Sequence, residues 1–194
     1  WLIGLSVAAL VPMVLLYQGL LNHNLWGGIG LTLLMVVTAF LFSAVAGYMA
    51  GLVGSSSNPV SGVTIATIML ASLLLRGILG KGNPAGPAAA LLVGAVVCCA
   101  AAMGGDNLQD LKTGHVVGAT PWKQQVMQVI GVATGAVVIV PVLSLLQAKY
   151  GIGEVTAVHP HPLSAPQATL MANLANGVFG GSLPWHLVGV GMVL

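Results

Sequence analysis

The chain has 194 residues, and only 4% of them are Asp, Glu, Lys or Arg. A soluble domain carries about 25% charged residues, and the mean hydropathy here is +1.01. Composition therefore excludes a water-soluble globular protein and indicates an integral membrane protein. The net charge is only +2 and aromatic residues make up 5% of the chain, so the sequence offers neither a basic run nor a stacking platform for nucleic acid.

Apolar runs of about 20 residues, the length that crosses a bilayer as a helix, follow one another along the chain. We predict five full spans and the start of a sixth, at residues 1–21, 25–53, 60–79, 85–103, 126–146 and 184–194. A further segment, 167–179, is weakly amphipathic. These runs are too long for barrel strands of about 10 alternating residues. The predicted fold is therefore all-α, a polytopic transmembrane helical bundle.

The ends of the sequence bear on domain organisation. The chain starts at Trp1 without a Met, and it stops at Leu194 within an apolar run. No charged segment precedes the first apolar run, so it does not have the form of a signal peptide. We expect residues 1–194 to be a single transmembrane domain and a fragment of a longer polytopic protein.

A polar segment, Gly54–Gly62, interrupts the apolar pattern with the sequence GSSSNPVSG. Pro59 suits the first position of a helix and disfavours helical geometry at Asn58, and Ser57 and Asn58 are favoured N-cap residues. We therefore predict a helix break between Gly54 and Pro59. It is either a tight turn between two spans or a break within the membrane, where the positive end of a half-helix binds an anionic group. The second alternative makes the polar side chains candidates for substrate binding: Ser55, Ser56, Ser57, Asn58, Ser61 and Thr64.

A second polar segment, Gly104–Gln125, holds four of the eight Asp, Glu, Lys and Arg residues of the chain. On a helix Asp106 and Asp110 would share a face, and Lys112 could neutralise one of them. Thr120 and Pro121 predict the start of another helix. The segment is either a solvated loop or a group of charges that acts in proton coupling or substrate contact. The second alternative makes six residues candidates for coupling or gating: Asp106, Gln109, Asp110, Lys112, His115 and Gln124.

The two alternatives for this segment differ in what its charges do. If the segment acts in transport, the charges of Asp110 and Lys112 should matter more than those in the turns and loops elsewhere. The charges chosen for this comparison are those of Arg76, Lys81 and Lys149.

Other candidate sites have simpler explanations. Cys98 and Cys99 are adjacent in an apolar run, which is typical of packing residues rather than of a disulfide framework. His159 and His161 flank prolines in a loop without further ligands nearby in the sequence, so we predict no metal site and no cofactor.

The run QDLKTGH, Gln109–His115, followed by Thr120 and Pro121, is similar to a motif of the oligopeptide transporter superfamily. It resembles the bacterial members close to the yellow stripe-like branch. Ala50–Ile65 resembles a second block of the family, and Gln167–Trp185 resembles a third more loosely. The N-P-G motif of the eukaryotic peptide-transporting branch is not found.

The resemblance implies a multi-pass secondary transporter of the bacterial inner membrane, with more helices than these and in contact with lipid. It implies proton-coupled uptake of small peptides or metal–chelate complexes, with protons as the coupling ion. A channel or a structural subunit of a membrane complex remains the alternative, although no repeated polar ring is visible. An enzyme is disfavoured, because an intramembrane aspartyl protease needs two carboxylates from different helices and no second span here holds one.

Overall fold

The structure is a computed structural model that describes residues 2–20, 25–153, 155–156 and 158–193. The described residues form seven α-helices and one 3-10 turn: α1 (Leu2–Leu20), α2 (Leu25–Val53), η1 (Ser55–Ser57), α3 (Val60–Leu79), α4 (Ala85–Val116), α5 (Pro121–Tyr150), α6 (Pro166–Gly180) and α7 (Trp185–Val193). Four of them, α2 to α5, are long and apolar enough to cross a membrane. The predicted all-α transmembrane bundle is confirmed.

The helix boundaries differ from the prediction around the charged segment. The fourth span was expected to end at Met103, but α4 continues to Val116. Helix α5 begins at Pro121 after Thr120, which confirms the predicted helix start, so this helix extends five residues ahead of the predicted span 126–146. The segment Gly104–Gln125 is therefore two helix ends joined by a short turn, and the interpretation as a loop is wrong. Each glycine of the segment weakens a helix by only about 1 kcal/mol. Its one proline, Pro121, stands at the start of α5, where a helix tolerates proline.

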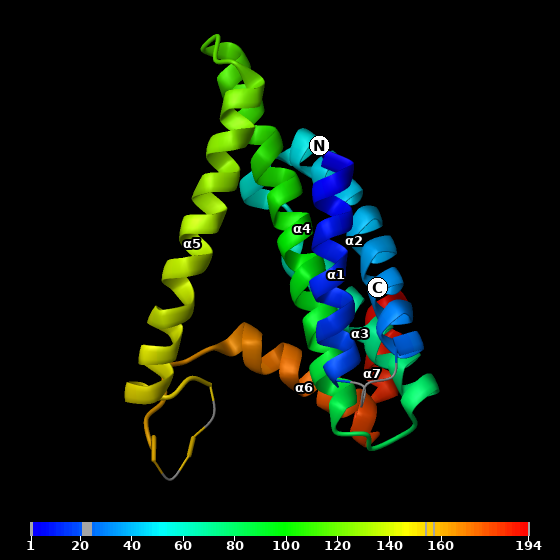
Figure 1. The fold of residues 1–194 in the computed structure, drawn as a ribbon. Helices are drawn as coiled ribbons and strands as arrows, with labels where there is room; N and C mark the ends of the chain where they lie inside the picture. The colour runs from blue at the N-terminus through cyan, green and yellow to red at the C-terminus, as the bar shows by residue number, and fades with distance from the viewer. Residues whose placement is uncertain (1, 21–24, 154, 157, 194) are drawn as a thin grey trace.

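Helix α4 is the centre of the bundle (Figure 1). Both α2 and α3 pack against α4 much more than against each other, and α1 packs on α2. Helix α6 lies across the lower end of the bundle and contacts α3 and α4. Helix α5 turns back from the upper end of α4 and diverges from it, so that none of its 30 residues, all of which are described, is buried.

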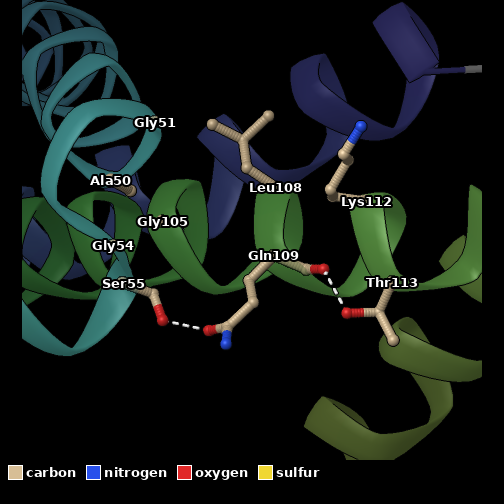
Figure 2. A pocket seen from close by; sticks show the side chains of 9 residues that line it. All are labelled: Ala50, Gly51, Gly54, Ser55, Gly105, Leu108, Gln109, Lys112 and Thr113. Carbon is tan, nitrogen blue, oxygen red and sulfur yellow. Dashed lines mark hydrogen bonds between the residues drawn. The ribbon is translucent and has the colours of Figure 1, made fainter. Parts of the chain in front are cut away.

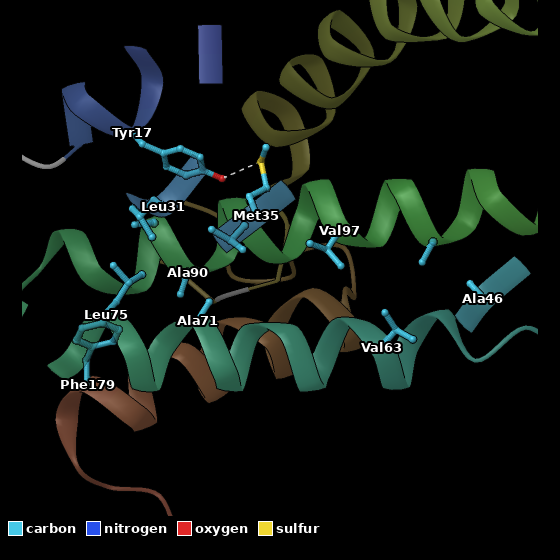
Figure 3. Packing of buried hydrophobic residues seen from close by; sticks show 13 residues of the cluster. Tyr17, Leu31, Met35, Ala46, Val63, Ala71, Leu75, Ala90, Val97 and Phe179 are labelled. Atoms are coloured by element: carbon cyan, nitrogen blue, oxygen red, sulfur yellow. Dashed lines mark hydrogen bonds between the residues drawn. The ribbon is translucent and has the colours of Figure 1, made fainter. Parts of the chain in front are cut away.

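The core lies where α2 and α3 meet α4 (Figure 3). The α4 side of this core is built from small residues, among them Ala90, Val97 and Ala101. A Cβ at Gly94 would overlap the side chain of Ile68 on α3, which shows how closely the two helices approach. Small residues at such contacts are the usual basis of helix association in membranes, where no hydrophobic force draws the helices together.

Arg76 joins two helices at the lower end of the bundle. Its guanidinium Nη1 donates a hydrogen bond of 2.5 Å to the carbonyl of Val178, in the last turn of α6, and the side chain is half-buried. A cation suits this position because the last carbonyls of a helix lack partners and carry the negative end of its dipole. The expectation that Arg76 is a solvated charge like Lys81, which is exposed in the turn after α3, is wrong.

We predict that Gly94→Ala destabilises the protein by about 1–3 kcal/mol, because the added methyl group overpacks the contact with Ile68. The measurement is thermal unfolding in detergent. Gly77→Ala, at a position in α3 where a Cβ meets no neighbour within 4 Å, is the matched control and should be neutral or stabilising. In an Ile68→Ala background Gly94→Ala should cost less. An equal cost in both backgrounds would contradict this explanation.

We also predict that Arg76→Gln lowers stability by about 1–3 kcal/mol, because it removes a charged hydrogen bond between two helices. Lys81→Gln should change stability by less than about 0.5 kcal/mol, as for an exposed site without partners. Thermal unfolding of the two variants side by side checks this, and equal shifts would refute a structural role of Arg76.

Candidate functional site

The predicted helix break is confirmed between α2 and α3. Helix α2 ends at Val53, Gly54 takes a φ of 88° that favours glycine, and α3 starts at Val60 after the 3-10 turn. Helices α2 and α3 run in opposite directions (Figure 1), and each is long enough to cross a membrane. The break is therefore a turn between two antiparallel candidate spans, and binding of an anionic group there stays a prediction.

Asn58 does not cap α3 as predicted. The N-cap position belongs to Pro59, without a side-chain hydrogen bond. The 3-10 turn instead directs the Asn58 side chain to α4, where its amide Nδ2 donates to the carbonyl of Ala101 at 3.4 Å. Gly105 leaves the room for this contact, since a Cβ there would lie 2.6 Å from Nδ2. The turn is thus attached to the middle helix at the start of the charged segment.

A small pocket forms where the break meets the charged segment (Figure 2). The hydroxyl of Ser55 donates a hydrogen bond to Oε1 of Gln109, and Thr113 donates to the backbone carbonyl of Gln109 at 2.9 Å. The pocket has a volume of about 280 Å³, and Lys112 is the one charged residue among the nine that line it. The two polar stretches singled out in the sequence therefore lie together.

The other residues of the break lie outside this pocket. Ser56, Ser57 and Ser61 are exposed, whereas Thr64 is buried and donates to the Val60 carbonyl of its own helix at 2.8 Å. Of the six candidates for substrate binding, Ser55 alone lines the pocket. A substrate role for the other five stays a prediction.

Asp110 faces α5. Its carboxylate Oδ2 accepts a hydrogen bond of 2.9 Å from Gln128, and its backbone carbonyl accepts one of 3.2 Å from Gln124. Gly114 makes room for Gln124, because a Cβ there would overlap the amide. A second pocket of about 610 Å³ lies here, lined by Gln109, Asp110, Thr113, Gln124, Met127 and Gln128. The two glutamines attach the upper end of α5 to α4.

Asp110 and Lys112 therefore lie on different sides of α4. Two residues apart on a helix with 3.6 residues per turn, they point about 160° apart. Within the described part of the chain, Lys112 makes no ion pair with Asp110 or Asp106, so the predicted neutralisation of an aspartate by Lys112 is not observed. Asp106 and His115 are exposed on α4 and line neither of the two pockets.

Gln128 is not among the six candidates for coupling or gating, and His159 was expected to be a loop histidine without a role as a ligand. Gln128 holds the Asp110 carboxylate, and its signal is the four-residue spacing from Gln124, which places both on one helix face. His159 has a structural role, because its Nε2 lies 3.3 Å from the Ala148 carbonyl at the end of α5. Within the described ranges, no group of three or more His, Cys, Asp or Glu side chains could hold a metal ion.

We predict a coupling free energy of about 1 kcal/mol between Asp110 and Gln128 in a double-mutant cycle of Asp110→Asn and Gln128→Leu. Thermal unfolding of the four proteins measures it. Gln125→Leu replaces an exposed glutamine of the same helix turn, and its coupling to Asp110→Asn should be close to zero. Equal coupling at Gln125 and Gln128 would show that the hydrogen bond does not hold α5.

Comparison with known proteins identifies the family. The OPT oligopeptide transporter protein family matches residues 1–194. The chain is 44% identical, over 83% of its length, to a protein of Haemophilus influenzae whose name assigns it provisionally to oligopeptide transport. It is 28% identical, over 71% of its length, to a protein of Saccharomyces cerevisiae with the same provisional assignment.

The chain spans 28% of the length of the Haemophilus influenzae protein and 18% of the Saccharomyces cerevisiae protein. No solved structure gives a significant match. The relationship to a bacterial protein and the apolar helices show a multi-pass integral membrane protein, and in bacteria helical bundles of this kind belong to the inner membrane, since the outer membrane holds β-barrels. Because the family match covers all 194 residues given, the chain belongs to the OPT oligopeptide transporters.

Proposed function

We propose that the full-length protein is a secondary active transporter that couples the uptake of small peptides or metal–chelate complexes to a proton gradient. One observation carries the proposal: Ser55 of the helix break is hydrogen-bonded to Gln109 of the charged segment, and both line one pocket. In a chain with 4% charged residues, polar groups gathered from two distant segments favour a solute-binding role. The names of the two relatives favour peptides as the solute.

Asp110 is the proposed site of proton coupling. Its carboxylate is held by the neutral amide of Gln128, so it can gain or lose a proton without breaking an ion pair. Protonation removes the negative charge that strengthens this hydrogen bond. The proton would thereby act on the attachment of α5 to α4, and α5 makes its helix contacts with α4 alone among the described elements.

We further propose that residues 1–194 form one transmembrane domain that is part of a longer bundle. Helix α5 is long and apolar enough to cross a membrane, yet none of its described residues is buried. The matched relatives are several times longer than the chain. Helices outside these residues would cover the apolar sides of α5 in the full-length protein.

The test uses the full-length protein in proteoliposomes with an inward proton gradient, offered short peptides and metal chelates. Wild-type protein should accumulate one of these classes saturably and lose accumulation when the gradient is collapsed. Asp110→Asn should abolish gradient-driven accumulation but keep exchange of labelled for unlabelled solute, because exchange does not require net proton movement.

Asp106→Asn is the comparison variant, since Asp106 lies one helix turn from Asp110 and lines neither pocket. It should retain both activities. Unsaturable flux, as through a channel, would refute the transporter proposal. If Asp106→Asn loses accumulation while Asp110→Asn accumulates normally, proton coupling belongs to Asp106, and the assignment to Asp110 is wrong.

A further inference from the structure

We propose that Lys112 binds a carboxylate group of the transported solute, in the pocket between the helix break and α4. This assignment rests on the proposed transport function and gives the pocket a ligand class. It also separates Lys112, as a binding residue, from Asp110, as the coupling residue on the other side of the same helix.

The charge of the pocket carries the inference. Lys112 is the one charged residue among its nine lining residues, which otherwise are glycine, apolar or neutral polar. The two aspartates of α4, Asp106 and Asp110, point about 120° and 160° away from Lys112 around the helix axis. Lys112 thus lines the pocket as an exposed side chain without a carboxylate of the described chain to neutralise it, and an anionic ligand suits its ammonium.

The neutral polar groups of the pocket include a hydrogen-bond donor that suits a ligand with acceptor atoms, such as a carboxylate. Ser55 donates its hydroxyl proton to Oε1 of Gln109, which fixes the amide so that the Nε2 group remains to donate elsewhere. Lys112 stands beside Leu108 on one side of the pocket, while Ser55 and Gln109 close the other (Figure 2). A carboxylate can only accept hydrogen bonds when ionised, so it matches donors such as the Gln109 amide and the Lys112 ammonium.

The size of the pocket points to the end of a solute rather than to a whole one. Its volume of about 280 Å³ is at the lower limit for sites that enclose a drug-sized ligand. It would hold a carboxylate with the adjoining part of one residue. A peptide C-terminus has this form, and so has a non-coordinating carboxylate of a metal chelate.

The experiment compares one short peptide as the free acid and as the C-terminal amide, taken up by the full-length protein in proteoliposomes. Wild-type protein should show a KM for the free acid about tenfold to a hundredfold below that for the amide, the range that a charged hydrogen bond gives. Lys112→Gln should raise the KM of the free acid to that of the amide and leave the KM of the amide unchanged. A chelate with one free or amidated non-coordinating carboxylate provides the same comparison if chelates are the solute.

Two variants control for folding and for charge in general. Lys112→Arg keeps the cation and should keep the preference for the free acid. Lys81→Gln removes an exposed cation of the turn between α3 and α4, and should change neither KM. If Lys112→Gln does not fold, Lys112→Met, which also removes the charge, takes its place in the acid–amide comparison.

The outcomes separate the two proposals. Absence of saturable uptake by wild-type protein removes the transport function, and with it the assignment of Lys112. Saturable uptake with equal KM values for acid and amide leaves the transport function intact and overturns the assignment. An equal rise of both KM values in Lys112→Gln also overturns it, because Lys112 would then act on something other than the carboxylate.

Discussion

The close approach of neighbouring elements to the small-residue surface of α4 is the constraint on which the rest of the structure depends. Membrane helices gain little from burying apolar surface against each other, so their association rests on van der Waals contact. Four glycines of α4 each pack against one side chain from another part of the chain: α6, α3, the break before α3, and α5. The pairs are Gly86–Phe179, Gly94–Ile68, Gly105–Asn58 and Gly114–Gln124. A side chain at any of these glycines would push the neighbouring element away.

The same contacts position the candidate site. The contact of Asn58 at Gly105 brings the break between α2 and α3 against α4, which places Ser55 beside Gln109. The contact of Gln124 at Gly114 brings α5 against the other side of α4, where Gln128 reaches Asp110. The polar groups of the site thus depend on packing contacts that carry no charge.

Much of the fold could be predicted from the sequence, because long apolar runs and a Ser-Asn-Pro break report directly on helices in lipid. The end of α4 was not predicted, because the polar and charged residues of Gly104–Val116 indicated a loop, although the segment holds no proline that would end the helix. The side chain of Asn58 was misassigned because local capping chemistry competes with a tertiary contact that only the position of α4 reveals. Arg76 was misassigned for a similar reason, since its partner lies 102 residues away in the sequence.

The attachment of α5 at one end has a mechanical consequence. Helix α5 has 30 residues, so its length is about 45 Å, and its hydrogen bonds to α4 lie in its first turns at Gln124 and Gln128. It is a lever with its pivot at the turn after Val116. A rotation of about 10° at the pivot would move the far end by about 8 Å. That far end leads through Gly151 towards α6, which packs on α3 and α4, so a change in two hydrogen bonds at one end of α5 would displace the end that is connected to α6.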